Sequence, residues 1–307
     1  MKIFILMGGS SSEKNISIKT GNAVIKALSS QYRNIIPVVI PINNDLSFLN
    51  EIKKGDIVFN ALHGGCGENG DLQSMLELND TVYTGSDSKA SKICINKHVS
   101  KLVAQSEGIC TPMWTLYKNK QFSRQKLFNS NNKFSYPYII KPNDEGSTMG
   151  LAKVEKEGDV SPAISNALEF SNEIMIEEYI SGREITVGIL GNKALPIVEI
   201  FPKKDFFDYE CKYSEGMSKY KVPAKIDKDI TSKIQKEALL IHESIGCRHY
   251  SRVDFILDDN NQHYFLEINS LPGMTSTSLL PMAAKDAGLE FDKLIDLILN
   301  MALLNND

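Results

Sequence analysis

Short apolar runs, separated by stretches with helical spacing, mark the first 90 residues of the chain. Residues 2–7 form an apolar run that ends in two glycines and three serines, and apolar side chains then recur at helical spacing over residues 20–28. Further apolar runs follow at residues 35–42, 56–62 and 82–85. This alternation predicts an α/β unit with a mainly parallel sheet, in which ligands bind at the loops that follow the strands.

After residue 90 the pattern predicts a mixed α+β arrangement. A helical pattern over residues 91–108 ends at Gly108 and leads into a strand near Pro112. The other predicted elements are strands over residues 136–141, 151–154, 174–180 and 185–190, helices over 163–170, 231–245 and 291–304, and a hairpin over 251–269. Residues 118–135 are polar and predict a surface helix and loop, whereas residues 203–218 have no period and predict a long functional loop.

The predicted hairpin carries the clearest chemical signal. Arg252 and Asp254 stand two residues apart on its first strand, as Glu267 and Asn269 do on its second. Alternation directs both pairs to one face of the hairpin. If the turn centres between residues 260 and 261, Asp254 lies opposite Glu267, and Arg252 lies opposite Asn269.

Two carboxylates that face each other across a strand pair repel, and a divalent cation between them keeps both ionised. Oxygen ligands without Cys or a nearby His favour Mg²⁺ or Mn²⁺ over zinc, and Mg²⁺ held by few carboxylates usually accompanies a phosphate substrate. The alternative is a solvated polar face on an amphipathic hairpin, with no bound ion.

Three loops are candidates for ligand binding, and each has a plain structural alternative. Residues 8–12 either offer backbone N–H groups to an anion or form only a tight turn. Glu13, which follows them, is either part of a substrate site or an ordinary acidic residue at a helix start. Residues 144–150 could cover phosphates or form a glycine hairpin. Residues 271–278 could supply an oxyanion site or only cap the next helix. A lone His63 at a strand end is interpreted as structural.

Composition narrows the class of protein. A chain of 307 residues, 42% hydrophobic and 23% charged, is globular, with about two domains by length alone. Its net charge of −4 lacks the broad positive field of a nucleic-acid-binding protein. Five cysteines without a CxxC pair indicate reduced thiols rather than a disulfide framework or a zinc cage. No apolar run approaches the ~18 residues of a membrane span, so we predict a cytoplasmic protein without a membrane partner.

Seven segments of the sequence occur in the order of one family's motifs. They are GGSSSEKNIS, ALHGGCGENGDLQ, IIKPNDEGSTMG, IEEYISGREITV, DYECKY, SRVDF and LEINSLPGMTSTS. Together they closely resemble the D-alanine:D-alanine ligases of the ATP-grasp superfamily. The resemblance implies an α/β fold of three domains, which we expect at residues 1–90 (N-terminal, parallel, substrate-binding), 91–182 (central ATP-grasp) and 183–307 (C-terminal ATP-grasp with the metal and second-substrate sites).

The activity implied by this resemblance is the ligation of two D-alanine molecules for peptidoglycan synthesis. The γ-phosphoryl group of ATP is transferred to one D-alanine carboxylate, and the amine of a second D-alanine attacks the acyl phosphate, giving D-alanyl-D-alanine, ADP and phosphate. The resemblance also implies a homodimer.

The nucleotide and metal residues are likewise implied by the resemblance. Those expected at ATP are Lys97 and Lys141 for phosphates, Glu177, Glu178 and Ile180 for adenine, Glu184 for ribose, and Lys212 for the γ-phosphate. Asp254, Glu267 and Asn269 match the positions that bind two Mg²⁺ ions, in agreement with the pairing derived for the hairpin.

The resemblance assigns the catalytic roles as well. Those expected are Glu13 for the first substrate's ammonium, Arg252 and the Gly273 N–H for the oxyanion, Ser278 and the Leu279 N–H for the second carboxylate, and Ser147 and Tyr213 for hydrogen bonds to Glu13. The chain departs from the family pattern at Asn15, Asn69, Thr148 and Ser270, none of which is a proposed ligand.

Two alternatives to this activity stay open. Tyr213 accompanies D-alanine as second substrate, whereas relatives that form a D-lactate ester differ in that loop. A nucleotide-binding regulatory protein without turnover is the other alternative, and the joint presence of Arg252, Asp254, Glu267 and Asn269 argues against it.

Overall fold

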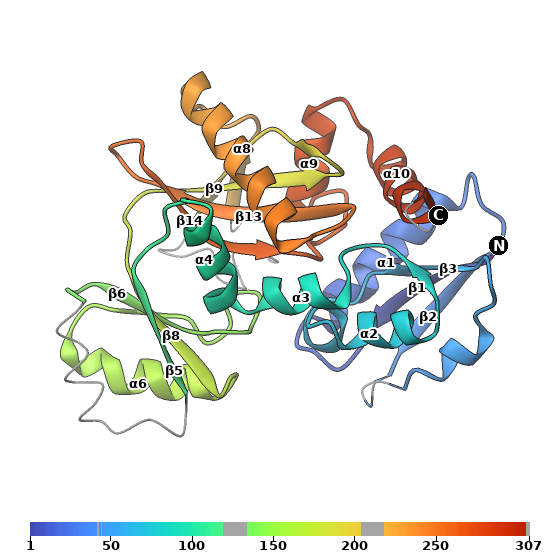
Figure 1. Cartoon of the computed structure of the whole chain (residues 1–307), viewed down its shortest axis with the longest axis horizontal. Helices are drawn as coiled ribbons and strands as arrows, with labels where there is room; N and C mark the ends of the chain where they lie inside the picture. The colour runs from blue at the N-terminus through green and yellow to red at the C-terminus, as the bar shows by residue number, and fades with distance from the viewer. Residues whose placement is uncertain (42, 44, 119–133, 204–217, 305–307) are drawn as a thin grey trace.

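Three β-sheets with helices around them form the molecule (Figure 1). The structure is a computed structural model that describes residues 1–41, 43, 45–118, 134–203 and 218–304. The N-terminal sheet lies at one end, the central sheet lies at the other, and the C-terminal sheet lies above and between them (Figure 1). This arrangement brings three separate units toward one another.

The N-terminal sheet is parallel, with the order β2-β1-β3-β4, as the apolar runs predict. Its elements are β1 (Ile3–Gly8), α1 (Lys14–Leu28), β2 (Ile35–Ile40), the 3₁₀ helix Ser47–Glu51, β3 (Ile57–Asn60), the 3₁₀ helix Gly65–Gly67, α2 (Asp71–Leu78) and β4 (Val82–Tyr83). Every residue of β1 and β3 is buried, because helices cover both faces of such a sheet. The loops after β1 and β3 therefore open at one edge.

The central sheet is antiparallel, with the order β5-β8-β6-β7. Its elements are β5 (Trp114–Lys118), β6 (Tyr138–Pro142), β7 (Ala152–Val154), α6 (Glu157–Leu168) and β8 (Glu173–Glu178). Helix α6 packs on β6, β7 and β8 through an apolar cluster that includes Ile140, Val160 and Ile176. This helix begins six residues before the predicted start at residue 163, with Pro162 inside it.

The C-terminal sheet has the order β12-β11-β9-β13-β14, and β10 pairs with β9. Its elements are β9 (Arg183–Leu190), β10 (Lys193–Ala194), β11 (Val198–Pro202), β12 (Ser218–Lys221), α8 (Lys228–Ile245), β13 (Tyr250–Leu257) and β14 (His263–Asn269). The sequence analysis does not identify strand β11, whose burial does not alternate as its sequence does. Val198, Glu199 and Ile200 are all buried there, and Arg183 neutralises the Glu199 carboxylate.

The single helix predicted over residues 91–108 is two helices, α3 (Ser88–Ile95) and α4 (Lys97–Ser106). Asn96 breaks the helix because its backbone is extended, and its side chain accepts a hydrogen bond of 3.0 Å from the Val99 N–H. Both helices pack on the C-terminal sheet in an apolar cluster with Val253 and Phe265. Lys97 follows this break directly as the first residue of α4.

The last two helices connect the C-terminal sheet to the N-terminal unit. Helix α9 (Leu279–Asp286) packs on β9, and α10 (Phe291–Leu304) packs on α1. Tyr32 donates a hydrogen bond of 2.7 Å to Asp296 at this contact. The two chain ends consequently lie on the same side of the molecule (Figure 1). The domain limits expected from the resemblance stay a prediction.

The hairpin of β13 and β14 has the predicted pairing, with Asp254 opposite Glu267 and Arg252 opposite Asn269. Nearer the turn the register shifts by one residue, since Phe255 lies opposite Phe265. This bulge reverses the alternation, so that Phe265 is buried in the core while Glu267 lines a cavity. The bulge therefore gives the hairpin a buried apolar end and a polar end.

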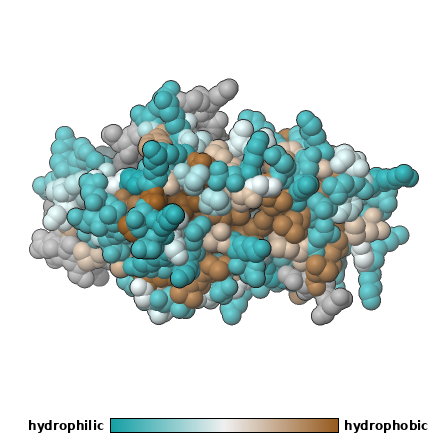
Figure 2. All heavy atoms as spheres, turned by 90° about the horizontal axis from the view of Figure 1, so that it is seen from above, coloured by the Kyte–Doolittle hydropathy of each residue, from teal (hydrophilic) through white to brown (hydrophobic). Residues whose placement is uncertain are grey.

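Apolar side chains gather in a band across the middle of the face seen from above, with hydrophilic side chains toward both ends (Figure 2). Among the helices that the structure describes, none is long and apolar enough to span a membrane.

Candidate active site

The larger of two cavities at the hairpin lies between the central and C-terminal sheets. Its volume is about 420 Å³, and its walls come from β6 and β8 on one side and from β9, β11, β13 and β14 on the other. The structure brings together here the predicted nucleotide and metal residues Lys97, Lys141, Glu177, Glu178, Ile180, Glu184, Asp254 and Glu267. Ile139, Ile200, Phe201 and Leu266 add apolar surface, which suits the flat ring of a nucleotide base.

Asp254 lies in a fixed set of hydrogen bonds at the polar end of the hairpin. The Arg252 guanidinium donates to both of its carboxylate oxygens, at 2.9 and 2.8 Å. The Asn269 amide donates to Oδ2 at 3.2 Å, and the Thr186 hydroxyl of the neighbouring strand donates to Oδ1. These contacts hold the carboxylate in one orientation toward the cavity.

Glu267 and Lys97 form the next charged contact along this wall. Lys97 Nζ lies 3.2 Å from Glu267 Oε2 and donates to the backbone carbonyl of Glu145 at 2.5 Å. Lys97 is the first residue of α4 and is 7% exposed. Its ammonium group therefore joins the hairpin to the loop after β6.

Glu177 lies between two lysines on the opposite wall. Lys141 Nζ donates to Glu177 Oε2 at 2.6 Å, and Lys101 Nζ forms an ion pair with Oε1 at 2.7 Å. Burial alone raises the pKa of Glu177, but Lys101 and Lys141 outweigh it and lower that pKa below its usual value. Burial lowers the pKa of Lys101 to about 8, although Glu177 opposes the shift. Sequence reasoning missed Lys101, because a lysine in an amphipathic helix predicts a solvated side chain.

The smaller cavity, of about 200 Å³, borders the next pair along the same face of the hairpin, Arg252 and Asn269. All the predicted catalytic residues that the structure describes line it, namely Glu13, Ser147, Arg252, Gly273 and Ser278. They come from the N-terminal unit, the loop between β6 and β7, β13, and the segment before α9. Lys212 and Tyr213 lie outside the described residues.

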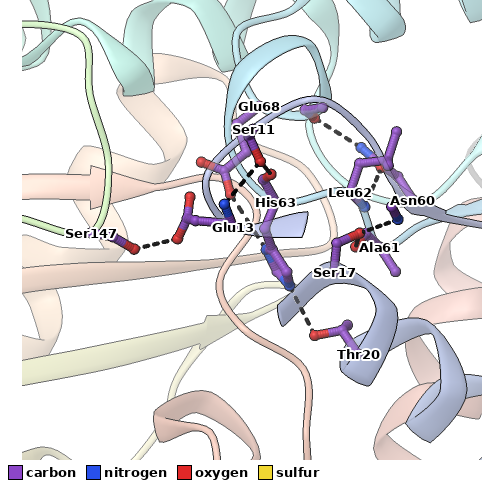
Figure 3. A network of polar contacts seen from close by, with 12 residues as sticks. Ser11, Glu13, Ser17, Thr20, Asn60, Ala61, Leu62, His63, Glu68 and Ser147 are labelled. Carbon is purple, nitrogen blue, oxygen red and sulfur yellow. Dashed lines mark hydrogen bonds and ion pairs between the residues drawn. The ribbon is translucent and has the colours of Figure 1, made fainter. Parts of the chain in front are cut away.

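Glu13 and Ser147 connect the N-terminal unit to the central loop. The Ser147 hydroxyl donates a hydrogen bond to Glu13 Oε1 (Figure 3). Glu13 is 7% exposed and lies against Gly64, where a Cβ would stand 2.8 Å from Glu13 Oε2. Ser147 and Thr148 have left-handed backbones with φ of 50° and 63°. The loop over residues 144–150 thus has an unusual backbone where it contacts the smaller cavity.

His63 and Glu68 also line the smaller cavity, and sequence reasoning assigned neither to a site. His63 Nε2 lies 2.9 Å from the Thr20 hydroxyl, and Nδ1 lies 3.4 Å from Glu68 Oε1 (Figure 3). Burial and the neighbouring Glu13 raise the pKa of Glu68, although His63 lowers it. The spacing of His63 and Glu68 around a glycine-rich segment is the signal that could have identified them.

The first two amides of the glycine and serine loop after β1 have partners within the protein. The Gly8 N–H donates to the Ser17 hydroxyl at 2.8 Å, and the Gly9 N–H donates to the Ile40 carbonyl at 2.9 Å. Gly8 has φ of +96°, and a Cβ there would lie 2.8 Å from the Ile40 carbonyl oxygen. Both amides already have partners within the protein.

The start of α9 completes the smaller cavity. Ser278 precedes the helix, and its hydroxyl makes no capping bond to α9 but accepts a hydrogen bond of 3.0 Å from the Thr275 N–H. A Cβ at Gly273 would lie 3.1 Å from the Ser278 hydroxyl. The first amides of α9 thus stand at the cavity, with the positive end of the helix dipole.

A third, narrow cavity of about 20 Å³ lies between the two larger ones. It shares Lys97, Glu145 and Glu267 with the larger cavity. It shares Glu68, Gly146 and Asn269 with the smaller cavity. The two cavities therefore meet at the polar end of the hairpin.

The donor atoms at this junction suit magnesium. Asp254, Glu267 and Asn269 offer oxygen ligands, and Mg²⁺ typically uses one or two carboxylates together with substrate phosphates. Among residues 1–118, 134–203 and 218–304, leaving aside 42 and 44, no group of three or more His, Cys, Asp or Glu side chains could hold a metal without a ligand. A bound triphosphate would supply the missing oxygens.

The fold and the joined cavities are those of an ATP-grasp ligase, and comparisons with known proteins identify the family. Family models described as the N-terminus and the C-terminus of D-ala D-ala ligase match residues 42–86 and 103–300. A D-alanine–D-alanine ligase of Aquifex aeolicus is 42% identical over 300 residues, which cover 97% of this chain and 100% of the relative.

Solved structures agree with these matches. The D-alanine–D-alanine ligase of Bacillus anthracis complexed with ATP has a TM-score of 0.87 and 33% identity, covering 100% of this chain and 98% of that one. The VanG D-Ala:D-Ser ligase of Enterococcus faecalis has a TM-score of 0.86 and 29% identity, covering 98% of this chain and 99% of that one.

The chain belongs to the D-alanine–D-alanine ligase family. The predicted family, the predicted fold class and the predicted class of enzyme, an ATP-dependent ligase that forms ADP, are confirmed.

Proposed function

We propose that the chain joins two D-alanine molecules, with ATP bound in the larger cavity and the amino acids bound in the smaller one. The observation that carries this proposal is the junction of the two cavities beside the facing carboxylates of Asp254 and Glu267. The γ-phosphate of ATP at this junction would lie next to the carboxylate of the first D-alanine, which accepts the phosphoryl group.

The nucleotide is held by charge at one end and by apolar contact at the other. Lys97 and Lys141 bind its phosphates, and Glu184 binds the ribose. Glu177, Glu178 and Ile180 lie at the adenine, and all of these residues line the larger cavity. The family resemblance assigns Lys212 to the γ-phosphate. Asp254, Glu267 and Asn269 would hold Mg²⁺, which neutralises the triphosphate charge when bound.

The amino acids are held by groups of opposite charge. Glu13 binds the ammonium of the first D-alanine, and the amides at the start of α9 with Ser278 bind the carboxylate of the second. Arg252 and the Gly273 N–H stabilise the oxyanion that forms when the second amine attacks the acyl phosphate. Ser147 holds its loop at Glu13 and helps to exclude water, which would hydrolyse that intermediate. The family resemblance assigns the same role to Tyr213.

We also propose that the enzyme is a cytoplasmic homodimer. ATP is a cytoplasmic substrate, and the free cysteines Cys66, Cys94, Cys110 and Cys247 fit a reducing compartment. Val39, Met75 and Leu78 expose apolar side chains on the N-terminal unit, which is where a partner could bind. Light scattering of the purified enzyme gives the mass that tests the dimer.

Phosphate release with purified enzyme, ATP and Mg²⁺ tests the proposed activity. We expect release that depends on D-alanine, with D-alanyl-D-alanine as the product, and little release with L-alanine. D-serine and D-lactate are the informative comparisons, because one structural relative is a D-Ala:D-Ser ligase. Mixed D-Ala–D-Ser or ester products as the main outcome at neutral pH would contradict D-alanine as second substrate, and no release at all would favour a regulatory protein.

A further inference from the structure

Lys101 lies behind the phosphate end of the larger cavity. It belongs to α4 and is 0% exposed, whereas Lys141 and Glu177 line the cavity. From the core to the cavity the order is Lys101, Glu177 and Lys141. Lys101 Nζ lies 2.7 Å from Glu177 Oε1, and Lys141 Nζ lies 2.6 Å from Glu177 Oε2. A bound nucleotide therefore meets Lys141, and Lys101 contacts Glu177 from the buried side.

The position of the Lys101 ammonium is fixed by both sheets. It donates hydrogen bonds to the Thr111 hydroxyl at 2.7 Å and to the Phe265 carbonyl at 3.2 Å. It also lies 5.7 Å from the centre of the Trp114 ring and 5.9 Å from that of the Phe265 ring. Trp114 belongs to β5 of the central sheet and Phe265 to β14 of the C-terminal sheet. The Lys101 ammonium cannot move toward a bound nucleotide without losing these contacts.

The charge of this cluster depends on Lys101. With Lys101 protonated, two positive charges and one negative charge leave a net charge of about +1 beside the cavity. Without Lys101 the remaining pair of Lys141 and Glu177 is neutral, and the ammonium of Lys141 is fully engaged by the carboxylate. A low effective dielectric constant makes a unit charge at this depth significant for an anionic ligand.

We propose that Lys101 is a positioning residue that offsets the charge of Glu177 from the buried side, so that Lys141 can bind the phosphates of ATP. This inference rests on the proposed function, because it assumes a nucleotide in the larger cavity. The role is electrostatic, so it concerns the phosphates of the ligand and leaves the binding of its base unchanged.

The test is calorimetric binding of ATP and of adenosine, with Mg²⁺ present and D-alanine absent, to wild type and to K101M. We expect ATP to bind roughly tenfold to a hundredfold more weakly to K101M, with adenosine binding within about twofold of wild type. Unchanged ATP affinity would overturn the proposal. So would an equal loss for ATP and adenosine, since that indicates a collapsed cavity.

A second variant keeps the test decisive if K101M does not fold. K101R keeps a positive charge behind Glu177, where Lys101 Nζ lies 2.7 Å from Glu177 Oε1. We expect its ATP affinity within about threefold of wild type, because the charge and not the shape of the side chain carries the role. A tenfold or larger loss of ATP affinity in a folded K101R enzyme would overturn the proposal.

A matched control removes Lys118, which pairs with Glu173 on β8, the strand that also carries Glu177. Lys118 Nζ lies 2.7 Å from Glu173 at the far end of β5, and its side chain is 62% exposed. K118M should leave ATP affinity unchanged, because water screens an exposed charge. Failure of D-alanine-dependent phosphate release in wild type would contradict the proposed function, whereas the binding ratios above judge Lys101 separately.

Discussion

The two cavities differ in how their polar groups are held. In the larger cavity the charged side chains of Lys141, Glu177 and Asp254 project from regular strands and are already paired with opposite charges. In the smaller cavity Glu13, Ser147 and other groups stand on loops and helix starts. Strand pairing fixes each wall of the larger cavity before a ligand arrives, whereas the smaller site depends on a contact between loops of separate units, from Ser147 to Glu13. Substitutions should therefore affect the two substrates differently.

The largest effect is expected where the cavities meet. E267Q should reduce turnover roughly a thousandfold or more, because it removes a negative charge that would hold the metal at the triphosphate. Stability should change little, since the amide has nearly the same shape. Steady-state phosphate release and thermal unfolding measure both quantities.

The matched control for E267Q is D259N, in the exposed turn of the same hairpin. It removes one carboxylate from the same element and should leave turnover unchanged. Near-normal turnover of a folded E267Q enzyme would show that this carboxylate does not hold the metal.

A smaller and more selective effect is expected in the smaller cavity. S147A removes the hydroxyl that donates to Glu13, which weakens the contact between the loop and the N-terminal unit. We expect kcat/KM for D-alanine to fall about tenfold, because a hydrogen bond to a charged group contributes roughly 1.5–3 kcal/mol. The KM for ATP should change less than twofold.

The corresponding control is S106A, an exposed serine at the end of α4. Its kinetic constants should equal those of wild type. An equal rise in the KM for ATP and for D-alanine in S147A would contradict the separation of the two sites.

The last effect concerns stability rather than catalysis, at the strand that both cavities share. His242 lies on α8, where its Nδ1 is 2.7 Å from the Ser251 hydroxyl of β13, and His249 directly precedes that strand. Both histidines are buried, and burial lowers their pKa values to about 4. The unfolded chain binds these protons near pH 6.5, so the native state loses stability as pH falls from 6.5 to 4. Each histidine contributes at most about 3 kcal/mol to the fall in the free energy of unfolding.

Denaturant unfolding at several pH values measures this dependence. H249N keeps a residue that tolerates the left-handed backbone, with φ of 63°, and should have a shallower pH dependence than wild type. An unchanged slope would mean that His249 does not titrate on unfolding. Both activities, ATP binding and D-alanine binding, should decline together in acid.

Much of the larger site could be predicted from local pattern. The two-residue spacing of Arg252 and Asp254, with a turn before Glu267, predicts the facing carboxylates that the structure contains. The bulge beside Phe265 could not be predicted, because it depends on packing against the core. The predicted pairing of Asp254 with Glu267 is nevertheless correct. The observed turn centres on Asn260 instead of between Asn260 and Asn261, and the bulge restores the predicted register beyond it.

The smaller site could not be predicted from pattern alone. Glu13, His63 and Ser147 are far apart in sequence, and each has an ordinary local explanation, so only the family resemblance joined them. Lys101 had no signal, because helical periodicity describes which face is apolar and not which lysine is buried against a carboxylate. Tertiary contacts between units decide these roles.

The measurement that tests the account most directly is a crystal structure of the enzyme with Mn²⁺ and a non-hydrolysable ATP analogue, using anomalous scattering to locate the metal. We expect manganese between Asp254 and Glu267, with the triphosphate reaching from Lys141 to the junction of the two cavities. A nucleotide bound elsewhere, or a metal that contacts neither carboxylate, would contradict the account.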